Sequence, residues 1–158
     1  MAIEIERKFL LKSEAWRATA DEGTRFRQGY IVGAELASVR VRIEGEVANI
    51  NIKSATLGIQ RQEFEYPIPL DDAEELLDTL CVQPQIEKTR YHVNHGSHLW
   101  EIDVFAGDNE GLVVAEVELE QEGESFTRPA WLGEEVSDDT RYYNVCLVKH
   151  PYSEWKNE

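Results

Sequence analysis

The first residues of the chain alternate between charged and mostly apolar side chains. Glu4, Glu6 and Lys8 occupy every second position of residues 3–11, and Ile5 and Phe9 are among the residues between and after them. Side chains two residues apart share one face of an extended strand, so this segment has a charged face and a largely apolar face. Two carboxylates and an ammonium group are costly to bury together unless a metal ion or an anion joins them. The segment is therefore predicted to be a strand whose charged face is either solvated or a binding surface.

The same alternation recurs in many short runs that are separated by turn residues, which is typical of an antiparallel sheet. Strands are predicted at 3–11, 25–32, 38–44, 47–53, 59–68, 86–93, 98–105 and 112–120, with a hairpin turn at 44–46. Helices are predicted at 13–20, 71–80, 128–132 and 138–149. Since eight antiparallel strands usually close to remove their edges, we expect a single mainly β (α+β) domain over residues 1–158. Its predicted architecture is a closed eight-stranded antiparallel β-barrel with a few flanking helices.

The net charge of −15, from 31 acidic and 16 basic residues, argues against nucleic acid or an anionic membrane surface as a partner. A small anion remains compatible if the cations gather locally and divalent metal is recruited. The apolar runs are too short to span a membrane and no apolar leader opens the chain, so we expect a cytoplasmic protein. Cys81 and Cys146 have no metal-site spacing and are expected to be free thiols.

The charged faces of the predicted strands sort by sign. Arg40 and Arg42 form a cationic pair on one strand, whereas Glu116 and Glu118 form an anionic pair on another. An ordinary sheet with one solvated side explains any single charged face. Like charges two residues apart repel, however, and a merely solvated surface gains nothing from that arrangement. Arginine forks match phosphate oxygens and paired carboxylates bind hard divalent ions, so the faces together predict a site for several phosphates and metal.

Eight short motifs occur in order along the chain. They are Glu-Ile-Glu-Arg-Lys at 4–8, Arg-Gln-Gly-Tyr at 27–30, Arg-Val-Arg at 40–42, Arg-Gln-Glu-Phe-Glu at 61–65, Glu-Lys-Thr-Arg-Tyr at 87–91, Glu-Ile-Asp-Val-Phe at 101–105, Glu-Val-Glu at 116–118 and Arg-Tyr-x-Asn at 141–144. This set resembles the CYTH family, also called triphosphate tunnel metalloenzymes, and looks most like its short bacterial inorganic tripolyphosphatases. The resemblance implies a barrel with charged side chains inside and Mg²⁺- or Mn²⁺-dependent chemistry on a triphosphate.

The resemblance also implies roles for individual residues. Those implied to bind phosphate are Lys8, Arg40, Arg42, Lys53, Arg61, Lys88 and Arg90. Those implied to bind metal are Glu4, Glu6, Asp103, Glu116 and Glu118, and the catalytic set is Glu4, Glu6, Lys8, Glu63 and Glu65. The general base stays open between a glutamate of the tunnel and metal-activated water. Tyr143 stands where close relatives often carry lysine, which bears on phosphate contacts at that end of the tunnel.

The predicted function is metal-dependent hydrolysis of inorganic tripolyphosphate or a related triphosphate. A thiamine triphosphatase or a class IV adenylate cyclase on the same fold is an alternative, and a non-catalytic module that binds polyphosphate or nucleotide is another. His92, His95 and His98 are expected to lie in and beside a solvated hairpin turn rather than in a zinc site. The outward apolar strand faces exceed what three helices can cover, which predicts a homodimer.

Overall fold

The computed structural model describes residues 3–33, 35–55 and 59–157, and these residues form nine strands and two α-helices. The strands are β1 (Ile3–Leu11), β2 (Thr24–Gly33), β3 (Ala37–Glu44), β4 (Val47–Ser54), β5 (Gln60–Ile68), β6 (Ile86–His95), β7 (His98–Phe105), β8 (Val113–Leu119) and β9 (Leu132–Glu135). The α-helices are α1 (Leu70–Thr79) and α2 (Asn144–Lys149). Short 3-10 helices are η1 (Ala15–Thr19), η2 (Gly107–Asn109), η3 (Thr140–Tyr142) and η4 (Tyr152–Asn157).

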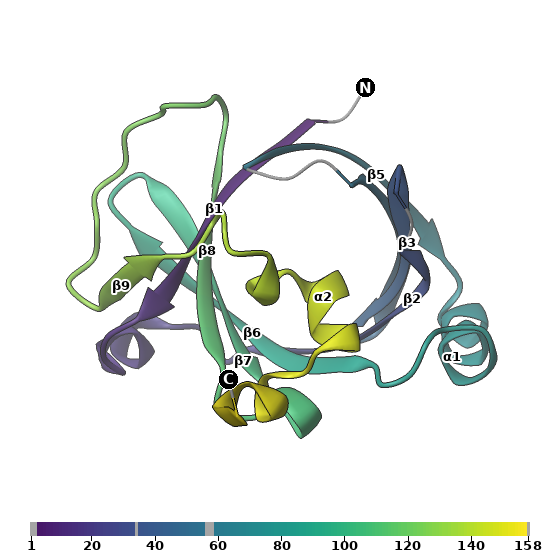
Figure 1. Cartoon of the computed structure of the whole chain (residues 1–158). Helices are drawn as coiled ribbons and strands as arrows, with labels where there is room; N and C mark the ends of the chain where they lie inside the picture. The colour runs from purple at the N-terminus through teal and green to yellow at the C-terminus, as the bar shows by residue number, and fades with distance from the viewer. Residues whose placement is uncertain (1–2, 34, 56–58, 158) are drawn as a thin grey trace.

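The predicted closed barrel is confirmed. Eight strands pair in the antiparallel order β5-β4-β3-β2-β6-β7-β8-β1, and β1 then pairs with β5 through Glu4 opposite Arg61. Figure 1 shows these strands as a ring. The eight predicted strands and the helix predicted at 71–80 all occur, with ends shifted by at most two residues. The hairpin turn predicted at 44–46 also occurs, and Gly45 at its centre has a φ of +60°, which favours glycine.

Beyond its contact with β5, strand β1 changes partner. Phe9 lies opposite Glu135 and Leu11 lies opposite Leu132 of β9, the strand that the sequence did not predict. The helix predicted at 128–132 is wrong, because Leu132 and Gly133 instead belong to β9 beside β1. Gly133 allows this close pairing, since a Cβ atom at that position would lie 2.9 Å from the backbone oxygen of Leu10.

The helix predicted at 138–149 is broken into η3 and α2. Tyr143 has an extended backbone (φ −72°, ψ 133°) between the two pieces. The carbonyl oxygen of Tyr142 accepts a hydrogen bond from Lys8 Nζ at 3.1 Å, so a contact with β1 replaces helical continuation there. The helix predicted at 13–20 is shorter than expected and is the 3-10 helix η1.

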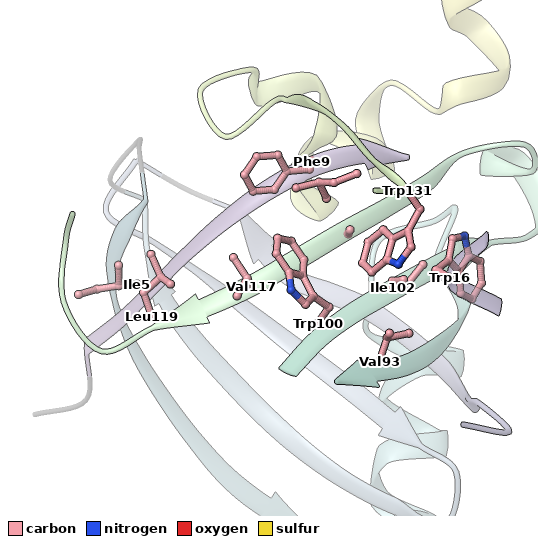
Figure 2. Close-up of a cluster of buried hydrophobic side chains, with 11 residues drawn as sticks. Ile5, Phe9, Trp16, Val93, Trp100, Ile102, Val117, Leu119 and Trp131 are labelled. Atoms are coloured by element: carbon pink, nitrogen blue, oxygen red, sulfur yellow. The ribbon is translucent and has the colours of Figure 1, made fainter. Parts of the chain in front are cut away.

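The outward faces of the strands are covered by later segments of the chain. Phe9 and Trp100 pack with Trp131 from the segment before β9 and with Trp16 of η1 in one buried cluster (Figure 2). A second cluster places α1 against β3 and β4, where Leu77 packs with buried residues of both strands. These contacts bury the apolar side of the alternation, so the charged side faces the interior of the barrel.

Helix α2 closes one end of the barrel. Its residues Leu147 and Val148 belong to a buried cluster with Ile86, Phe105 and Val114. Each of these three strand residues lies two positions from a charged residue of its own strand (Lys88, Asp103 or Glu116). They therefore share the inward face of the barrel. In Figure 1, α2 lies within the outline of the ring. The interior is thus apolar beside α2 and charged beyond it.

Three further expectations meet the structure outside the barrel interior. Cys81 and Cys146 are free cysteines, as predicted. Among the described residues, no helix is long and apolar enough to cross a membrane. On the outer face of β5, Phe64 is 36% exposed and Tyr66 is 55% exposed. Exposed aromatic side chains on an outer strand face do not by themselves test the predicted homodimer, which stays a prediction.

Candidate functional site

The barrel interior holds a cavity of about 270 Å³ that side chains from all eight strands line. The inward positions of β1 contribute Glu4, Glu6 and Lys8, as the alternation of the first residues predicts. The other predicted site residues in the lining are Arg40, Arg42, Lys53, Arg61, Glu63, Glu65, Lys88, Arg90, Glu116 and Glu118. The structure therefore brings these predicted charges from six of the eight strands into one site, and β2 and β7 contribute none of them.

Carboxylates dominate the wall that β1 and β8 form. Glu6 lies directly opposite Glu118, and Lys8 lies directly opposite Glu116. Burial and the nearby charge of Glu116 raise the pKa of Glu6 to about 8. A raised pKa means that the folded protein disfavours negative charge at this carboxyl group. This wall therefore carries negative charge that its own cations do not fully balance.

Two cations connect the carboxylate wall to β4 and β5. Lys53 Nζ lies 3.0 Å from a carboxylate oxygen of Glu4 and 3.4 Å from one of Glu63. Arg61 lies 3.7 Å from Glu4 and 3.6 Å from Glu6. The distances to Arg61 are long for hydrogen bonds, so its guanidinium group has donors available for another acceptor.

The opposite wall carries buried cations from β3 and β6. Arg40, Arg42 and Lys88 are 5%, 8% and 1% exposed. Burial and the neighbouring charges of Arg40 and Arg90 lower the pKa of Arg42 to about 10. The Nε atom of Arg40 is buried and has no hydrogen-bond partner within the described chain. An unsatisfied buried guanidinium N–H group beside other cations is suited to bind an anion, to which it can donate a hydrogen bond.

An aromatic ring supports these cations from β2. The guanidinium carbons of Arg42 and Arg90 each lie 4.9 Å from the ring centroid of Phe26, and Lys88 Nζ lies 5.6 Å from it. Gln28 of the same strand accepts a hydrogen bond from Arg42 Nε at 2.9 Å. Both residues face inward, Phe26 directly before the Arg-Gln-Gly-Tyr motif and Gln28 within it, and sequence reasoning gave neither a role.

Asp103 lies behind the cations of β6 and is 1% exposed. It accepts hydrogen bonds from Arg90 Nε at 2.7 Å and Nη2 at 2.9 Å, and from Lys88 Nζ at 2.8 Å. Burial alone would raise the pKa of Asp103, but Arg90 and Lys88 outweigh it and lower that pKa to about 2. Both carboxylate oxygens of Asp103 are thus engaged with cations.

The closed end of the cavity is made by the residues that begin α2. Asn144 Oδ1 accepts hydrogen bonds from Lys88 Nζ at 3.0 Å and from Gln28 Nε2 at 2.8 Å. The ring centroid of Tyr143 lies 5.5 Å from Lys8 Nζ and 5.4 Å from the guanidinium carbon of Arg61. Tyr143 therefore places an aromatic face rather than a charge beside these cations.

Comparison with models of known protein families places this chain in a family. The model of the CYTH domain matches residues 2–146 of the chain. The chain belongs to the CYTH family.

Relatives of this CYTH chain are similar over nearly their whole length. An inorganic triphosphatase of Acetivibrio thermocellus is 45% identical over 156 residues, which cover 99% of each chain. One of Nitrosomonas europaea is 37% identical over 153 residues, which cover 92% of this chain and 96% of the relative. The solved structure of an inorganic triphosphatase matches with a TM-score of 0.64 and 34% identity, covering 91% of this chain and 96% of the other.

A more distant structure shows the fold alone. A Hippeastrum protein for which a dominant triphosphatase activity is described matches with a TM-score of 0.57 and 13% identity. The match covers 77% of this CYTH chain and 80% of the Hippeastrum chain.

The donor chemistry of the cavity suits a hard divalent cation. Within residues 3–33, 35–55 and 59–157, no three His, Cys, Asp or Glu side chains are disposed to hold a metal ion. Mg²⁺ usually takes only one or two carboxylates from a protein and completes its shell with waters and phosphate oxygens. Glu6, with its raised pKa, and Glu118, whose pKa is raised by burial and then by Glu4, would both gain from such a charge. The carboxylate wall therefore fits a metal that binds together with phosphate.

The histidines of the β6–β7 hairpin lie in different surroundings. His95 and His98 lie opposite each other at the two ends of the turn, as the sequence predicts. His92, in contrast, lies within β6 and lines the cavity. It is a functional candidate that sequence reasoning missed, and its inward parity with Lys88 and Arg90 is the signal that identifies it.

Proposed function

We propose that this CYTH protein hydrolyses inorganic tripolyphosphate inside the barrel with the help of Mg²⁺ or Mn²⁺. The observation that carries the proposal is a cavity inside a closed barrel, with buried cations on one wall and carboxylates on the other. The inorganic triphosphatases that are 45% and 37% identical over nearly the whole chain support the same reaction. The substrate would be a small molecule, and no nucleic acid or membrane is required.

The cationic wall would bind and align the phosphates. Arg40 and Arg42 would donate to phosphate oxygens from β3, and Lys88 and Arg90 would do so from β6. Asp103 and Asn144 fix the position of Lys88, and Asp103 also fixes Arg90. We therefore assign Asp103 to positioning the cations rather than to binding metal. Preorganised cations stabilise the charge of the transition state without reorganising during the reaction.

The remaining three cations would complete the phosphate site around β1. Lys8 is held by Tyr142 O and lies 3.7 Å from Glu116. Lys53 and Arg61 lie among the carboxylates of Glu4, Glu6 and Glu63, where they can bridge phosphate and protein. These contacts would hold the substrate between the two walls.

The carboxylate wall would hold the metal and accept a proton. Glu4, Glu6, Glu116 and Glu118 are the residues that we propose to bind Mg²⁺ or Mn²⁺. The bound ion would neutralise phosphate oxygens and lower the pKa of a nearby water. The proton acceptor for the attacking water would be either metal-activated water or one of the cavity glutamates of β1 and β5, namely Glu4, Glu6, Glu63 and Glu65. Single glutamine substitutions at these four positions would identify it.

Phosphate release from a panel of substrates tests the proposal. Purified protein is incubated with tripolyphosphate, thiamine triphosphate, ATP or pyrophosphate, each with Mg²⁺, Mn²⁺ or EDTA. We expect rapid release from tripolyphosphate that EDTA abolishes. Faster phosphate release from thiamine triphosphate than from tripolyphosphate would identify a thiamine triphosphatase instead. Formation of cyclic nucleotide from ATP would identify an adenylate cyclase instead. Tight binding of tripolyphosphate without any release would favour the non-catalytic module.

A further inference from the structure

His92 continues the row of cations that β6 presents to the cavity. Lys88, Arg90 and His92 occupy successive inward positions, roughly 6.6 Å apart along the strand. Exposure of the side chains increases along this row, from 1% for Lys88 to 9% for Arg90 and 35% for His92. The row therefore runs from the closed end beside α2 to a part of the cavity that solvent reaches.

The imidazole ring has a carboxylate near each of its two nitrogen atoms. Asp21, which follows η1, lies 3.2 Å from Nδ1 and also accepts the backbone N–H of His92 at 3.0 Å. Glu101, directly opposite on β7, lies 3.5 Å from Nε2. The hydrogen bond to Asp21 fixes the ring and directs Nε2 into the cavity. The contact of Nε2 with Glu101 is long for a hydrogen bond, so this donor is available to another acceptor.

We propose that His92 is a phosphate-binding residue of the cavity, in which the imidazolium Nε2–H donates to a phosphate oxygen of the bound tripolyphosphate. This inference rests on the proposed function. The charged groups that face His92 are Asp21, Glu101 and Arg90, and Arg90 donates to the same carboxylate of Glu101 at 3.1 Å. Glu101 can thus stay paired with Arg90 while the Nε2–H group of His92 donates to phosphate. The pKa of His92 is raised, first by Glu101 and then by Asp21, so the charged form is favoured before phosphate enters.

The first experiment follows the imidazole groups of the metal-free protein by NMR while tripolyphosphate is added. The chain has four histidines, so each ring can be assigned by substitution. We expect the pKa of His92 to rise on saturation, whereas the pKa of His95 stays constant. Histidine 95 is the internal control because it lies three residues along the same strand and faces the other side. Backbone amide signals of Arg40 and Arg42 report independently whether tripolyphosphate occupies the cavity.

The outcomes separate the two proposals. Saturating shifts at Arg40 and Arg42 with an unchanged pKa at His92 would overturn the role of His92 and leave the proposed function standing. No shift at any of the three residues would overturn the role of His92, because tripolyphosphate would then not occupy the cationic wall of the metal-free protein. Phosphate release with Mg²⁺ or Mn²⁺ would decide the proposed function separately. A merely structural histidine, held by Asp21 and Glu101, would not respond to the ligand.

A pair of variants provides the second measurement. His92→Gln removes the charged donor, and we expect the Kd for tripolyphosphate to increase about tenfold at pH 6, as for the loss of one charge-assisted hydrogen bond. At a higher pH at which His92 of the parent protein has lost its charge, the difference should nearly vanish. The control variant His95→Gln should bind as the parent protein does at both pH values. Equal affinities of His92→Gln and the parent protein at pH 6 would refute the proposal.

Discussion

Replacing Asp103 with asparagine is expected to lower the free energy of unfolding by about 3–5 kcal/mol. The Asp103 carboxylate is 1% exposed and accepts hydrogen bonds from Arg90 at 2.7 Å and 2.9 Å and from Lys88 at 2.8 Å. Asparagine preserves the shape of the side chain but removes its negative charge. In the variant, Arg90 would still pair with Glu101 and Lys88 would still donate to Asn144. The two buried cations would, however, lose the negative charge that both of them contact. The magnitude is that of breaking a buried ion pair by removing one partner.

Urea titration followed by tryptophan fluorescence measures this effect, with EDTA present so that metal does not contribute. Glu118→Gln is the matched control, since Glu118 faces the same cavity. Burial and the nearby charge of Glu4 raise the pKa of Glu118, so removing its charge should leave the free energy of unfolding unchanged or increase it. A parental urea midpoint for Asp103→Asn would refute the positioning role.

Three further substitutions test the site and the fold. Glu4→Gln should retain the parental circular dichroism spectrum and reduce the turnover of tripolyphosphate by about two orders of magnitude, and unchanged turnover would remove Glu4 from the site. Trp100→Ala should lower the free energy of unfolding by about 3–5 kcal/mol, because Trp100 is 0% exposed in the buried cluster that it forms with Phe9 and Trp131. A loss below about 1 kcal/mol in urea titration would contradict that packing. Gly133→Ala should lower the melting temperature, because its Cβ would meet the backbone oxygen of Leu10, and an unchanged melting temperature would show that β9 moves aside freely.

The barrel could be predicted from the sequence because its strands are apolar on one side and charged on the other. Val41 and Ile43 alternate with Arg40 and Arg42, and a shift of one residue would exchange the two sides. Strand β9 could not be predicted in the same way, since its four residues carry no such alternation. Its place depends on the backbone of β1, which lies more than a hundred residues away in the sequence.

The site could be predicted as a set of charges but not as a set of partners. Asp103 and Glu116 both alternate with apolar residues, yet Asp103 is engaged by two cations behind the cavity lining and Glu116 faces the cavity. Alternation gives the face of a residue, whereas its depth and partners depend on the register between strands. His92 already lay within the strand predicted at 86–93. Its role was missed because it was grouped with the histidines of the turn rather than with Lys88 and Arg90, which share its face of β6.

Phosphorus NMR of tripolyphosphate mixed with the protein and Mg²⁺ tests the central claim most directly. Hydrolysis of one anhydride bond predicts the appearance of orthophosphate and pyrophosphate in equal amounts, and EDTA should prevent both from appearing. A tripolyphosphate spectrum that stays unchanged with Mg²⁺ and with Mn²⁺ would contradict the claim that the charged barrel interior is a triphosphatase site.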